Sequence, residues 1–192
     1  MGSAGIARNA ATGQFTGLLI GLVFGLVFVE VSSGDLPVNW SFGLRAAGVM
    51  IAVMLFVGLL WRRRLLDQAG QRADRFNRRY WAVVAVEVVA LLVGLAIIKR
   101  VLDADRFIVT WIAVVVGVHF FGLGAIWRDK RLYQVGTVLT LIGLAGFVIG
   151  AVGGSAAAIA LVSGVGSGAA LFVGVGLTLL AAQPWSTGDG PH

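Results

Sequence analysis

The sequence predicts an all-α protein, a polytopic membrane bundle of six transmembrane helices. Hydrophobic residues make up 58% of its 192 residues. The mean hydropathy is +0.93, which is too apolar for a soluble domain that must cover itself with polar surface. A bilayer core about 30 Å thick needs roughly 20 residues of helix. Six apolar runs approach or exceed this length, and they leave no room for a separate soluble domain. The runs are 14–31, 42–61, 80–98, 108–127, 132–152 and 156–182.

Basic residues predict the side of the membrane on which each connection lies. Cytoplasmic loops are enriched in Lys and Arg, and the connection 62–79 holds seven of the fifteen basic residues. If this loop is cytoplasmic, six spans place both termini in the cytoplasm, with eleven basic residues inside and four outside. The polar ends are 1–13, expected to be flexible, and the tail 183–192. Thirteen Arg against two Lys, with abundant Ala, Gly and Val, is typical of GC-rich bacteria, so we expect a multi-pass protein of the cell (inner) membrane.

Composition also limits the chemistry that we expect. The chain has no cysteine, which excludes disulfides and thiolate metal sites. Its net charge of +6 comes from arginines beside apolar runs, where a topology signal and anionic lipid explain them better than nucleic acid does. The spans contain no HExxH motif and no paired aspartates. We therefore expect no enzyme activity, no catalytic residue, no cofactor and no metal.

The first run, 14–31, carries a stripe of small residues. Gly17, Gly21 and Gly25 recur every fourth residue, so they share one helical face, which a second helix can approach closely. Such a glycine zipper predicts either packing within the bundle or a contact in a homo-oligomer. The run could also be a secretory signal peptide, although Glu30 and the lack of an A-x-A site argue against cleavage.

The connection 62–79 follows the second span and predicts a contact with lipid. Its apolar residues fall at helical spacings between charged ones, which is typical of a short amphipathic helix on the inner leaflet. Its arginines would attract anionic lipid or a partner, or they would only set the orientation. The lipid-binding candidates are Arg62, Arg63, Arg64, Arg72, Arg75, Arg78 and Arg79.

The third and fourth spans each carry one ionisable residue at membrane depth. Glu87 lies seven residues after Tyr80, and His119 lies eight before Trp127. Each is therefore about 10 to 12 Å from the inner boundary at 1.5 Å per residue. Ionisable groups at this depth are costly and point to function. In an antiparallel hairpin the two residues would form an intramembrane polar pair, which could carry a proton or could only lock the hairpin.

A second acid–base pair is expected near the outer face. Glu30 is sixteen residues from Gln14, and Arg45 is sixteen from Trp61, so the two lie at matched depth on neighbouring spans. Both are close to water. An interfacial ion pair, which the long side chains can reach by snorkelling, is therefore favoured over a gate.

The last run, 156–182, is longer than the membrane requires. Its 27 residues would form a helix of about 40 Å, against a core of roughly 30 Å. The helix must tilt, or it must break within the segment 163–168, where Ser163 and Ser167 could line a pathway. Close helix packing through small residues is the alternative, and Gly146 and Gly150 of the fifth span have the same spacing.

One segment invites comparison with known families. Residues 116–128, VGVHFFGLGAIWR, resemble a segment of small multi-pass bacterial membrane proteins of unassigned function. The resemblance covers one helix and implies a membrane location without implying an activity.

Two functional hypotheses remain open. The first is a small transporter or channel with Glu87 and His119 as its intramembrane site, which predicts a polar, water-accessible cavity. The second is a structural or accessory membrane protein that packs through its glycine faces and binds anionic lipid or a partner. It predicts a dry, closed bundle.

Overall fold

The computed structural model describes residues 3–68 and 78–181, and the side chains of 17–62 and 78–181. Within these ranges it has six helical spans long and apolar enough to cross a membrane and no strand, which confirms the all-α six-span architecture. The short turns η1 (Ser33–Asp35) and η2 (Asp105–Phe107) precede the second and fourth spans. The spans are α1 (Ser3–Ser32), α2 (Val38–Gln68), α3 (Arg78–Arg100), α4 (Ile108–Trp127), α5 (Lys130–Ala151) and a composite of α6 (Ala156–Ile159), the π-helical turn η3 (Ala160–Val165) and α7 (Gly166–Ala181).

Two helices extend beyond the apolar runs. Helix α1 begins at Ser3, so the expectation that residues 1–13 are unstructured is wrong for residues 3–13. This stretch is rich in alanine and lacks proline, which favours helix, while its polar residues keep it outside the apolar run. Helix α2 continues to Gln68, so the first part of the basic connection prolongs the span instead of starting a separate helix. Residues 69–77 and 182–192 lie outside the described residues.

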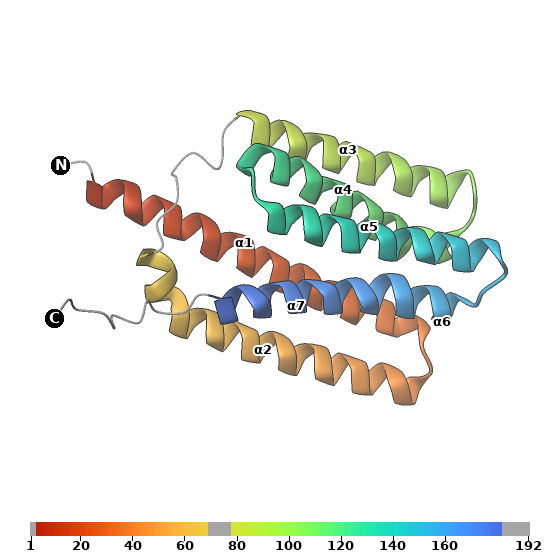
Figure 1. Cartoon of the computed structure of the whole chain (residues 1–192). Helices are drawn as coiled ribbons and strands as arrows, with labels where there is room; N and C mark the ends of the chain where they lie inside the picture. Colours follow the sequence, from red (N-terminus) through yellow and green to blue (C-terminus); the bar gives the residue numbers. More distant parts are fainter. Residues whose placement is uncertain (1–2, 69–77, 182–192) are drawn as a thin grey trace.

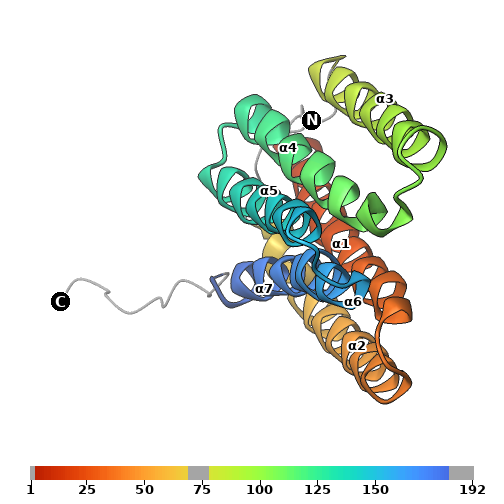
Figure 2. The same ribbon diagram turned by 90° about the vertical axis from the view of Figure 1, so that its right-hand side faces the viewer.

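The spans form two groups that meet at the π-helical turn. Helices α3, α4 and α5 make one group, in which α4 contacts both neighbours, and helices α1, α2 and α7 make the other (Figures 1 and 2). The turn η3 contacts α1, α4, α5 and α7. Helix α1 begins, and helix α7 ends, at the same end of the bundle (Figure 1).

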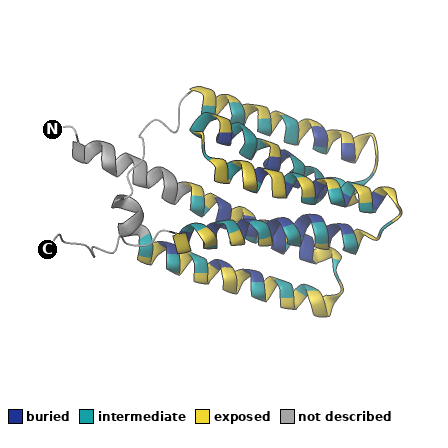
Figure 3. Cartoon of the chain, viewed as in Figure 1, coloured by how far each residue is buried: buried dark blue, intermediate teal, exposed yellow. Residues whose placement is uncertain are grey.

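Burial differs strongly between the spans. The last span, α6 to α7, is the most enclosed (Figure 3). Half of the residues in its most apolar 18-residue stretch are buried, against 6% in the corresponding stretch of α3. Helix α3 therefore lies at the periphery, attached mainly to α4. The last span runs as one continuous helical path through the π-helical turn, without an unwound break.

Glycines bring helix backbones into direct contact within each group. At the crossing of α1 and α7, a Cβ added to Gly168 would lie 2.7 Å from the carbonyl oxygen of Gly25. Between α4 and α5, a Cβ on Gly117 would lie 2.9 Å from the carbonyl oxygen of Gly136. Of the stripe noted in the first span, Gly25 and Gly21 face α7, while Gly17 has open space around it. The described contacts of this stripe are thus within the chain.

Gly168→Ala should destabilise the bundle, because its Cβ would meet backbone that cannot rotate away. We expect a loss of about 1–3 kcal/mol of unfolding free energy, as for other overpacked sites, measured by equilibrium unfolding in detergent. Gly17→Ala is the matched control, since it adds the same methyl group to a helix where nothing lies within 4 Å. Equal stabilities for the two variants would show that this crossing is not closely packed.

Candidate functional site

The structure brings Glu87 of α3 and His119 of α4 together. The imidazole Nδ1 lies 3.0 Å from the carboxylate Oε2, and the side chains are 13% (His119) and 16% (Glu87) exposed. The distance is that of an ion pair when the imidazole is protonated. The Nδ1 nevertheless makes no aligned hydrogen bond, so the contact depends on charge and proximity more than on direction. When the imidazole is protonated and the carboxylate is ionised, the pair carries no net charge. Moving the proton from one group to the other also leaves the net charge at zero.

Two glycine contacts set the register that places these residues opposite each other. Toward the start of α3, Gly122 of α4 receives Val83 of α3, whose Cγ1 would lie 2.9 Å from an added Cβ. Toward the end of α3, Gly94 makes room for the indole of Trp111. The Trp111 Nε1 also donates a hydrogen bond of 3.3 Å to the carbonyl oxygen of Ala90. The antiparallel pair α3–α4 is thus held on both sides of the acid–base contact.

A groove of about 750 Å³ runs beside the pair, between α3 and α4 and reaching Tyr133 of α5. Its lining is apolar except for Glu87, His119 and the tyrosine. Val86 and Val118 border it and are 69% and 54% exposed, so the groove opens on the outer surface of the bundle. In a membrane this surface faces lipid.

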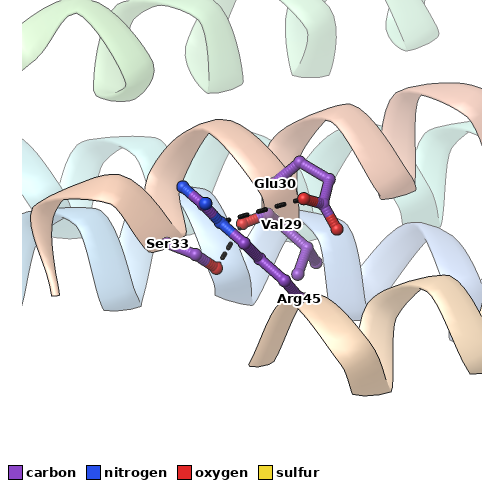
Figure 4. Close-up of polar contacts among 4 residues, drawn as sticks. All are labelled: Val29, Glu30, Ser33 and Arg45. Carbon is purple, nitrogen blue, oxygen red and sulfur yellow. Dashed lines mark hydrogen bonds and ion pairs between the residues drawn. The ribbon is translucent and has the colours of Figure 1, made fainter. Parts of the chain in front are cut away.

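The pair of Glu30 and Arg45 is looser than the pair of Glu87 and His119. Arg45 extends from α2 across to Glu30 of α1 (Figure 4), with 3.8 Å between Nε and Oε2, and the side chains are 48% (Arg45) and 35% (Glu30) exposed. Beside them Ser33 donates a 2.6 Å hydrogen bond to the Val29 carbonyl oxygen. Exposed pairs of this kind contribute less than about 1 kcal/mol. The geometry fits a link between helix ends.

Ser163 and Ser167 lie in the bundle core, and neither lines the groove. Both are fully buried. The Thr110 hydroxyl donates to Ser163 Oγ at 3.2 Å, and Ser163 is 3.5 Å from the Ile142 carbonyl oxygen. The hydroxyl of Ser167 makes no hydrogen bond with any residue that the structure describes. These serines support close packing beside η3.

Sequence reasoning missed two members of this hydroxyl cluster. Ser32 is fully buried, makes no hydrogen bond through its hydroxyl and sits against Gly164, while Thr110 bonds Ser163. Both lie near the ends of apolar runs, where a small hydroxyl side chain normally indicates the end of a span. The spacing of the runs does not predict that either residue is buried near η3.

The basic residues of the connection divide between described and undescribed parts. The Arg62 guanidinium donates to the carbonyl oxygen of Leu179, near the C-terminal end of α7, where carbonyl groups lack helical partners. It therefore links α2 to α7. Arg78 and Arg79 are exposed at the start of α3. The side chains of Arg63 and Arg64, and the whole of Arg72 and Arg75, lie outside the described residues.

Comparison with known proteins adds no relative. No family model matches the chain, and no curated protein or solved structure is significantly similar to it.

The energetic coupling of Glu87 and His119 can be measured with a double-mutant cycle of Glu87→Gln and His119→Ala. We expect a coupling of about 0.5–2 kcal/mol, the range of interhelical polar contacts in membranes, from equilibrium unfolding of the four proteins in detergent. A parallel cycle on Glu30 and Arg45 provides the comparison and should give a smaller value. Additive effects at Glu87 and His119 would mean that the contact is absent in the folded protein.

Proposed function

We propose that this integral membrane protein is a small transporter in which Glu87 and His119 form the intramembrane site and the adjoining groove gives access to it. The contact of a carboxylate with an imidazole beside an open groove carries the proposal. Two ionisable groups within apolar spans are costly to retain, and a helix-locking contact alone could be made by uncharged side chains. A pair that can gain and lose one proton next to a ligand-sized space is suited to coupled movement.

The peripheral position of α3 would allow this helix to move relative to α4. Few residues of α3 are buried, and a segment with little buried contact can shift at low free-energy cost. A movement of α3 against α4 would change both the distance between Glu87 and His119 and the width of the groove. The site and the least enclosed helix are therefore the same structural unit.

The rest of the proposal concerns location. We place the chain in the inner membrane of a bacterium, with both termini and the basic connection in the cytoplasm, where its arginines bind anionic lipid. The common end of the bundle at which α1 begins and α7 ends is consistent with termini on one side. We assign no catalytic reaction, cofactor or metal to the chain.

The alternative is a structural or accessory membrane protein. The nearly apolar lining of the groove favours it, because an aqueous pathway normally carries more polar groups. The glycine contacts that close the two helix groups are equally suited to a scaffold. In this alternative the contact between Glu87 and His119 only fixes α3 on α4.

Proton movement in reconstituted vesicles distinguishes the two functions. With an imposed membrane potential and a pH-sensitive dye inside the vesicles, the wild-type protein should move protons faster than protein-free vesicles do. Glu87→Gln and His119→Ala should reduce the rate at least tenfold, because each removes one member of the proton-sharing pair. Glu30→Gln is the matched control. It neutralises a carboxylate near the end of α1 that does not line the groove, and it should leave the rate unchanged.

Gel filtration of each variant before reconstitution verifies that it is folded. A wild-type rate equal to that of empty vesicles, or a full rate in Glu87→Gln, would refute transport through this site and support the accessory function.

A further inference from the structure

The groove beside the acid–base pair has a lining of one chemical character. Three aromatic residues border it, with Trp111 and Phe121 on α4 and Tyr133 on α5, and the remaining wall is mostly alanine and valine. The rings of Phe121 and Tyr133 lie 6.2 Å apart with a tilt of 39°. Aromatic faces attract cations, and more strongly where water is excluded. A volume of about 750 Å³ falls within the usual range for small-molecule sites.

The charges at the groove favour a cation over an anion. Among the described residues that line it, no Lys or Arg is present, and Glu87 is the one carboxylate. When His119 is neutral, that carboxylate is without a counter-charge. When His119 is protonated, the imidazolium occupies the position 3.0 Å from Oε2. A ligand cation and the imidazolium would therefore compete for the same carboxylate.

The opening of the groove favours a lipophilic molecule. Its bordering residues Val86 and Val118 are exposed on the outer surface of the bundle, where the solvent is hydrocarbon. A strongly hydrated cation would have to lose its water to enter through this opening. A cation whose charge is covered by apolar groups would enter without that cost.

We propose that the groove is a binding site for lipophilic monovalent cations, with the positive charge placed against Glu87 and the apolar body against the aromatic wall. The inference depends on the site assigned above, but it does not require that the site transports. The bound cation takes the place of the imidazolium against the Glu87 carboxylate. Of the groups lining the groove on α3, α4 and α5, Glu87, His119 and Tyr133 are the titratable ones.

Two probes of matched shape and opposite charge test the sign of the site. Equilibrium dialysis of radiolabelled tetraphenylphosphonium against the purified protein in detergent should show saturable binding. Tetraphenylborate, of nearly the same shape, should show none above empty micelles. Equal binding of the two probes would overturn the proposal, because it would show unselective partitioning into an apolar surface.

Variants then test the position of the site. Glu87→Gln should weaken tetraphenylphosphonium binding at least tenfold, whereas Glu30→Gln should change it less than twofold. His119→Gln should bind at least as tightly as the wild type, because the competing imidazolium is removed. Unchanged binding in Glu87→Gln, or tenfold weaker binding in His119→Gln, would contradict the proposal.

A steric pair keeps the test valid if Glu87→Gln does not fold. Val118→Trp places a bulky side chain at the opening of the groove and should abolish binding. Val148→Trp makes the same change at a residue of α5 that is 61% exposed and does not line the groove, and it should bind normally. Equal binding in these two variants would place any cation elsewhere.

The binding and transport results can fail separately. Selective, Glu87-dependent cation binding without proton movement would support the site and refute the transport function. Glu87-dependent proton movement without cation binding would support the transport function and refute this ligand class.

Discussion

Close contact between helix backbones is the constraint on which the rest of the structure depends. Lipid tails are as apolar as leucine, so burying apolar side chains does little to hold membrane helices together, and packing must do so. The glycine crossings Gly25–Gly168 and Gly117–Gly136 permit this approach within each helix group. Helix α3 is attached by fewer contacts, mainly to α4 and centred on Gly94 and Gly122. The peripheral position of the acid–base pair follows from this difference.

The two acid–base pairs show how position changes the role of the same chemistry. Each joins a carboxylate and a base on antiparallel neighbouring helices. Glu30 and Arg45 are partly exposed and 3.8 Å apart, so water and solvent ions can replace either partner. Glu87 and His119 are mostly enclosed and 3.0 Å apart, so each charged form is stabilised chiefly by the other residue. A permanently charged arginine suits the first position, whereas a base that can lose its proton gives the second a changeable charge.

Run length and depth were readable from the sequence, but rotation was not. Six spans follow from hydropathy, and nearly equal distances from Tyr80 and Trp127 predict that Glu87 lies opposite His119. The helical start of α1 was missed because polar residues such as Arg8 and Asn9 end the apolar run, although the alanines around them still favour helix. The contact of Ser163 with Thr110 and the burial of Ser167 could not be predicted, since they depend on which helices surround η3. The groove likewise depends on which faces of α3, α4 and α5 lie side by side. The spacing of residues along the sequence does not predict this arrangement.

The π-helical turn solves a problem of angular phase in the last span. Its buried residues repeat every fourth position, as in Ile159, Ser163, Ser167, Leu171 and Val175. In a regular α-helix each four-residue step advances by about 400°, so such a stripe drifts by about 40° per step. The wider turn η3 advances less per residue and removes part of this drift, which keeps the stripe directed at the other helices. Forcing the six residues of η3 into regular α-helix would leave the span continuous but would rotate α7 by roughly one residue's advance, about 100°, turning its core face toward lipid.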